Sequence, residues 1–289
     1  MEKADLSRRR FTLLAGTLTA GRISSQGASA LTAREVVQRI ETTLGGEWSS
    51  EDPDGFKAGD PDTPITGIAT TAMATLDVLR RAMKARANLI ITYEPTFFGR
   101  QDAAVPDDAV YQSKKAFIEK HRLAVFRLRD HWQARKENDM LTGLAESLGW
   151  TKYRVKQDDA LYDIPAASAE NTVAVIRKKL NLRGGLRAVG DRKAQVRRVL
   201  LHPGVMTIAT MWRRYGETDL TLAGEVREWE NTHYAADIHT IGEKRALVTI
   251  GRVASEDPGM RVCAKWLHTV MPDIPAHWVA AGDLYWRPV

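Results

Sequence analysis

Short apolar runs alternate with longer amphipathic stretches along most of this 289-residue chain. A capping box at Thr32 and Glu35 starts a first helix, and apolar residues at helical spacing predict further helices over 76–87, 107–121, 137–148, 168–180, 227–242 and 260–270. Shorter apolar runs predict buried strands over 65–71, 88–94, 123–128, 186–190, 196–202, 220–225 and 246–251. The alternation of strand and helix indicates βαβ units and a mostly parallel sheet.

The order of these elements divides the chain into parts. Residues 31–149 and 217–289 each contain a strand–helix series, whereas residues 150–216 combine one helix with two strands. We therefore predict an α/β fold with two related strand–helix halves, whose mixed or parallel sheets surround a central cleft. Residues 150–216 are predicted to form an inserted α+β module between the N-terminal half, 31–149, and the C-terminal half, 217–289.

The first 30 residues have the three parts of an export signal. Ser7-Arg8-Arg9-Arg10-Phe11 matches the twin-arginine pattern, a mildly apolar run follows as far as Gly21, and Ala28-Ser29-Ala30 is an A-x-A cleavage site. We expect residues 1–30 to be a twin-arginine signal peptide and the mature protein to be periplasmic or otherwise extracytoplasmic. Neither the leader nor any later stretch is long and apolar enough for a membrane-spanning helix.

Charge and cysteine content narrow the classes of function. The formal net charge is +6, and half of it comes from the leader, where five basic residues stand against two acidic ones. The weak charge of the remaining chain argues against a nucleic-acid partner, which needs a concentrated basic face. Cys263 is the only cysteine, so no intramolecular disulfide can form, and its apolar helical surroundings predict a core residue.

The most informative stretch is an apolar run that stops abruptly at Tyr93, Glu94 and Pro95. Pro95 cannot donate to a strand ladder and favours extended geometry at Glu94, so the predicted strand ends there. Ligands of open α/β sheets bind outside the carboxyl ends of the strands. Glu94 is therefore a candidate site residue; the alternative is an acid at a strand end that faces water.

Three other predicted strands also end in polar clusters, which contain Asp130 with His131, Glu225 and Glu256. If these strands share a sheet, the side chains converge with Glu94 on one rim. Two or three carboxylates with one imidazole could hold a divalent metal, or could transfer protons without one. The structural alternative is that Asp130 caps a turn and that Glu256 is an acid favoured near a helix start.

The order of motifs resembles the NIF-three-like dinuclear-metal-centre family, often described as GTP cyclohydrolase I type two homologues. The resemblance covers most of the chain after the leader, and it is carried by residues 54–59, 66–79, 87–95, 141–149, 223–225 and 251–256. It implies that Glu94, Asp130, His131 and Glu256 hold divalent zinc, iron, manganese or nickel. It also implies a metal-dependent hydrolase of an unidentified small molecule and a toroidal homohexamer.

Departures from the family pattern lead to a second hypothesis. Positions that are metal-binding histidines in the family correspond here to Tyr93, Glu94 and Arg252, and Arg129 stands at the start of the Asp130-His131 loop. Arginine cannot ligate a metal, but it can pair with Glu94 or Glu256. The alternative is therefore a non-catalytic family member that has lost the metal site and binds an anionic ligand or a protein partner.

Overall fold

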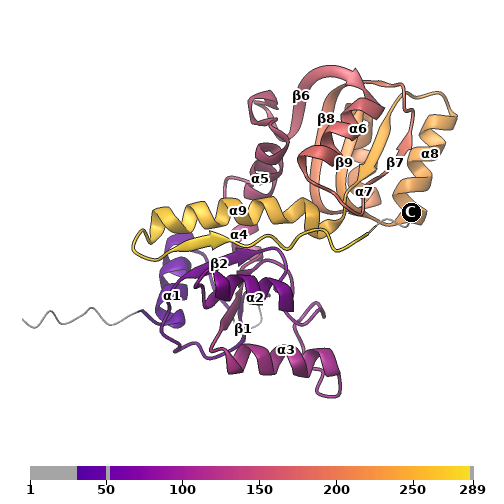
Figure 1. Cartoon of the computed structure of the whole chain (residues 1–289). Helices are drawn as coiled ribbons and strands as arrows, with labels where there is room; N and C mark the ends of the chain where they lie inside the picture. Colours follow the sequence, from indigo (N-terminus) through magenta and orange to yellow (C-terminus); the bar gives the residue numbers. More distant parts are fainter. Residues whose placement is uncertain (1–30, 50–52, 287–289) are drawn as a thin grey trace, which may run out of the picture.

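The computed structural model describes residues 31–49 and 53–286, so the expected signal peptide lies outside the described residues. Two lobes lie on either side of the long helix α9 (Arg252–Val270), as Figure 1 shows. Each lobe contains one sheet with helices packed on it, which confirms the predicted α/β class. No helix in the described part of the chain could cross a membrane.

The first sheet is mostly parallel and contains the three strands predicted over 65–71, 88–94 and 123–128, together with two strands that the sequence pattern did not predict, β1 and β11. Its strand order is β1 (Gly55–Ala58), β4 (Ala124–Arg127), β3 (Leu89–Thr92), β2 (Ile68–Thr71) and β11 (Ala276–Trp278). Every residue of β2, β3 and β4 is buried, because helices cover both faces. Helices α1 (Ala33–Leu44) and α9 pack on one face, and α2 (Leu76–Lys84) and α3 (Ala109–Lys120) pack on the other.

The second sheet joins the strands of residues 150–216 to those that follow. Its order is β5 (Arg154–Val155), β6 (Asp158–Ser168), β8 (Gln195–Met206), β9 (Leu220–Val226), β10 (Ala246–Thr249) and β7 (Arg187–Gly190). The boundary drawn at residue 216 thus falls between β8 and β9, which pair in parallel. Helices α5 (Asp139–Leu148) and α6 (Ala169–Lys179) cover one face, and α7 (Ile208–Arg214) and α8 (His233–Thr240) cover the other.

Helix α9 starts earlier than the sequence pattern predicted. The expected start was residue 260, but α9 begins at Arg252 and contains Pro258. Ser255, Glu256 and Asp257 are polar yet buried, so the apolar periodicity that marks a helix is absent from these turns. The early start places Arg252 and Glu256 on adjacent turns of one helix.

Candidate functional site

Strand ends from both sheets meet at the junction between the lobes. Glu94 follows β3, where its N–H donates to the carbonyl of Ala72 at 2.9 Å. Arg129 follows β4, and Arg252 opens α9 just after β10. Glu94 is only 8% exposed, so the alternative of a strand-end acid facing water is wrong.

Two guanidinium groups approach the carboxylate of Glu94. Arg252 Nη2 donates to Glu94 Oε1 at 2.7 Å, and Arg129 Nε lies 3.8 Å from the same oxygen. Arg252 Nε also lies 3.5 Å from Oε1 of Glu256. The hypothesis that an arginine pairs with these glutamates is therefore confirmed.

Glu256 is enclosed more completely than Glu94. It is 3% exposed, and a Cβ at Gly204, where φ is +79°, would come within 2.8 Å of Glu256 Oε1. Burial, together with the negative charge of Glu94, raises the pKa of Glu256 to about 8. Glu256 is therefore mostly protonated at neutral pH, and its buried Oε2 has no hydrogen-bond partner among the described residues.

Tyr93 forms an aromatic wall beside Arg129. The guanidinium carbon of Arg129 lies 5.4 Å from the centre of the Tyr93 ring, and the Tyr93 hydroxyl donates to Gln133 Oε1 at 3.3 Å. Burial raises the pKa of Tyr93, so its hydroxyl stays protonated. The position that is a metal-binding histidine in the family thus stacks against a cation here.

His131 belongs to a neighbouring network organised by Asp54. Its Nδ1 lies 2.8 Å from Asp54 Oδ2, its Nε2 lies 3.0 Å from the carbonyl oxygen of Glu47, and its ring stacks on Trp48 at 3.5 Å. Asp54 also accepts the backbone N–H groups of Arg129, Asp130 and His131. Asp54 thereby holds the start of α4 (Asp130–Gln133) in place.

The structure brings several of the predicted site residues together. Glu94 and Glu256 meet through Arg252, and Asp130 joins this cluster through Arg129, whose Nη1 lies 3.1 Å from Asp130 Oδ1. Sequence reasoning missed Asp54 as an organising residue, although it begins the 54–59 segment that carries part of the family resemblance. Glu225, at the end of β9, is exposed to solvent.

Comparison with models of protein families identifies the family of this chain. The model of the family Duf34/NIF3 (NGG1p interacting factor 3) matches residues 31–280. The chain belongs to the DUF34/NIF3 family. A curated relative, the GTP cyclohydrolase 1 type 2 homolog of Chlamydia pneumoniae, is 31% identical over 65 residues. That match spans 22% of this chain and 26% of the relative's length.

Solved structures share the fold of this DUF34/NIF3 protein over most of its length. Staphylococcus aureus hypothetical protein SA1388 superimposes with a TM-score of 0.68 at 15% identity, covering 87% of this chain and 96% of that chain. A Bacillus cereus protein related to NIF3 gives a TM-score of 0.67 at 14% identity, with coverages of 91% and 99%. Reduced HcgD from Methanocaldococcus jannaschii gives 0.58 at 16% identity, with coverages of 86% and 98%. At such low sequence identities, these structural matches establish the fold alone.

The residues at the centre do not fit the divalent ion that the family resemblance implies. Arg252 pairs with Glu94 Oε1, and a guanidinium group has no lone pair and repels a nearby cation. Arg252 Nε also lies 3.5 Å from Glu256 Oε1, and both ring nitrogens of His131 have partners. Over residues 31–49 and 53–286, no group of three or more His, Cys, Asp or Glu side chains is arranged to hold a metal.

Proposed function

We propose that this DUF34/NIF3 protein binds a small molecule with an oxyanion group at the Glu94 centre and needs no metal to do so. The contact that carries the proposal is the 2.7 Å pair between Arg252 and Glu94, with the charge of Arg129 beside it. Two cations sit where the metal-dependent hypothesis requires a cation-binding site. An anion is the ligand class that such a pair of guanidinium groups recognises.

Unused hydrogen-bond donors support an anionic ligand. Among the described residues, the buried Nε atoms of Arg129 and Arg252 have no hydrogen-bond partner. No side chain caps the N-terminus of α9, and its first turn holds no acidic residue, so its backbone dipole also favours a negative ligand. An oxyanion at the start of α9 would lie beside the guanidinium groups of Arg129 and Arg252, which it could approach by competing with Asp130 and Glu94 for them.

The test measures metal content and anion binding on the same preparation. The protein is purified without chelator, its metals are measured by plasma mass spectrometry, and inorganic phosphate and malonate are titrated by calorimetry. We expect no stoichiometric metal, and we expect one of the two anions to bind. Binding should be lost in Arg252→Met and kept in Arg34→Met, which removes an exposed ion pair with Asp62 elsewhere on the first lobe.

The opposite result would support the hypothesis of a metal site. Near-stoichiometric zinc, iron, manganese or nickel that disappears in Glu94→Ala and Glu256→Ala would overturn the proposal. Arg252→Met also leaves the buried Glu94 without its closest cation, although Arg129 remains beside it, which should lower the free energy of unfolding by roughly 1–3 kcal/mol. The Glu94→Gln/Arg252→Met double variant removes both charges, so it should recover part of that loss in urea denaturation and still fail to bind anions.

A further inference from the structure

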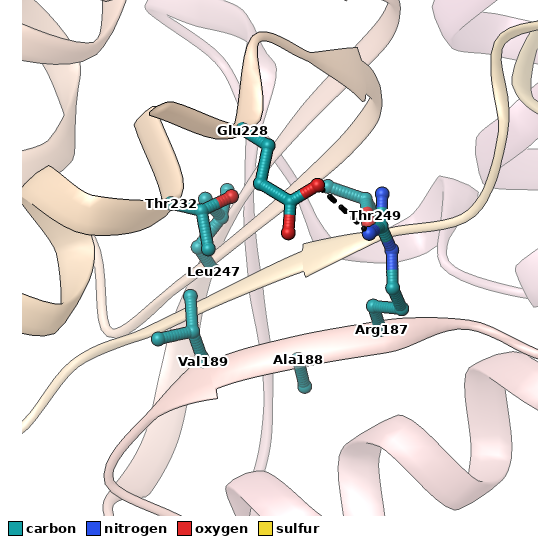
Figure 2. Close-up of a pocket in the computed structure, with 7 residues that line it drawn as sticks. All are labelled: Arg187, Ala188, Val189, Glu228, Thr232, Leu247 and Thr249. Carbon is teal, nitrogen blue, oxygen red and sulfur yellow. Dashed lines mark hydrogen bonds and ion pairs between the residues drawn. The ribbon is translucent and has the colours of Figure 1, made fainter. Parts of the chain in front are cut away.

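A separate pocket lies on the second lobe, away from the Glu94 centre. It has a volume of about 330 Å³ and lies between edge strand β7, strand β10 and the π-helical turn η3 (Glu228–Thr232) that leads into α8. Its lining residues, drawn in Figure 2, are Arg187, Ala188, Val189, Glu228, Thr232, Leu247 and Thr249. None of them belongs to the Glu94 centre, so this pocket is independent of the function proposed above.

The base of the pocket is apolar and its rim is charged. Leu247 is 1% exposed and packs in the core beneath α7 and α8, with Val189 packed beside it. Arg187 and Glu228 point toward each other across the pocket, as Figure 2 shows, with Arg187 Nη1 3.3 Å from Glu228 Oε2. Their side chains are 74% and 64% exposed, so this pair contributes little to stability and opens at little cost.

The rim also has unused polar groups and an uncommon backbone turn. Within the described part of the chain, the hydroxyls of Thr232 and Thr249 make no hydrogen bond, although both residues line the pocket. Glu228 and Thr232 are the first and last residues of the π-helical turn. Such turns are rare and occur often at functional sites. The pocket therefore offers two opposite charges and two hydroxyls above an apolar base.

The opposite charges select the class of ligand. Glu228 repels a simple anion, Arg187 repels a simple cation, and a neutral molecule leaves the ion pair closed. A zwitterion satisfies both groups, with its carboxylate on Arg187 and its ammonium on Glu228. The volume lies at the lower end of the range of about 300–1,000 Å³ for ligand pockets, which suits a small molecule with a short apolar side chain against Val189 and Leu247.

We propose that this pocket binds a free zwitterionic amino acid with an apolar side chain. The test is calorimetric titration of the whole protein with L-leucine, N-acetyl-L-leucine and L-leucinamide. The second compound lacks the ammonium and the third lacks the carboxylate, so each removes one half of the recognition. We expect leucine to bind and each blocked compound to bind about tenfold more weakly or worse. Glycine should also bind more weakly, because it has no side chain for the apolar base.

Variants of the rim residues test whether leucine binds in this pocket. Arg187→Met and Glu228→Gln should each weaken leucine binding by about tenfold or more, since each leaves one ligand charge unpaired. Both residues are exposed, so both variants should fold, and circular dichroism checks this. Arg34→Met, which breaks another exposed ion pair, should bind like the wild type. The proposal is overturned if leucine does not bind, if both rim variants bind it normally, or if the blocked compounds bind equally well.

Discussion

The buried charged side chains near the end of β3 each have a specific hydrogen-bond or ion-pair partner. Arg127 is 3% exposed; its Nη1 donates to the carbonyl of Arg100 at 2.9 Å and lies 3.6 Å from Asp102 Oδ2. Asp102 accepts the N–H of Phe97 at 2.7 Å, and Lys114 donates to the carbonyl oxygen of Thr96. These charges hold the loop that follows Glu94, so the position of Glu94 depends on them.

Lys114 gives this loop a pH dependence that can be measured. It is fully buried, and burial lowers its pKa from 10.5 to about 8. Between these two values the unfolded chain binds more protons at Lys114 than the folded chain does, so this group makes stability rise with pH. Below pH 8 both states carry the charge, and the folded state bears the full cost of burying it.

We predict that Lys114→Met removes this rise. Urea denaturation at several pH values between 8 and 10.5 should give an unfolding free energy for the wild type that increases relative to the variant. Titrating tyrosines are common to both proteins and cancel in the difference. A constant difference between wild type and variant over this interval would show that Lys114 does not titrate as described.

Among the helices, the crossing of α5 and α9 requires an especially close approach. A Cβ at Gly143 of α5 would lie 2.3 Å from the carbonyl oxygen of Pro258 in α9, and a Cβ at Gly259 would lie 2.4 Å from Met140 Sδ. Two glycines therefore let the helix backbones nearly touch. Since Arg252 and Glu256 lie on the first turns of α9, this crossing also determines where they sit relative to the strand ends.

Gly143→Ala should therefore destabilise the protein. The added methyl group meets backbone atoms that cannot rotate away, which costs about 1–3 kcal/mol and outweighs the roughly 1 kcal/mol gained in helix propensity. Urea denaturation measures the difference. Gly216→Ala is the matched control, because a Cβ there has no atom within 4 Å. Equal stability of the two variants would show that the helices can separate without cost.

Considered as a whole, the molecule builds its candidate centre from both lobes. Glu94 comes from the end of a strand in the first sheet, whereas Arg252 follows the second sheet and Gly204 belongs to it. The chain after β11 also returns to the second lobe, where Asp283 Oδ2 accepts the N–H of Gly184 at 2.7 Å.

The leader predicts that the protein is exported. We predict that the wild type is found outside the cytoplasm and has lost the 1–30 leader, which contains the twin-arginine pattern. An Arg8→Lys/Arg9→Lys double variant should remain full-length in the cytoplasm. Cell fractionation with mass spectrometry of the intact protein measures both, and Arg22→Lys serves as a control within the leader. Normal processing of the double variant would contradict the prediction.

The periodicity of apolar residues was enough to predict the α/β class, most strands and the burial of Cys263, because these depend on local patterns of side chains. Motif order along the chain was enough to suggest the family. Only the tertiary structure decided that Arg252 pairs with Glu94, 158 residues away, and that His131 is held by Asp54, 77 residues away. Such contacts depend on how strand ends and helices pack in space, which local periodicity does not encode.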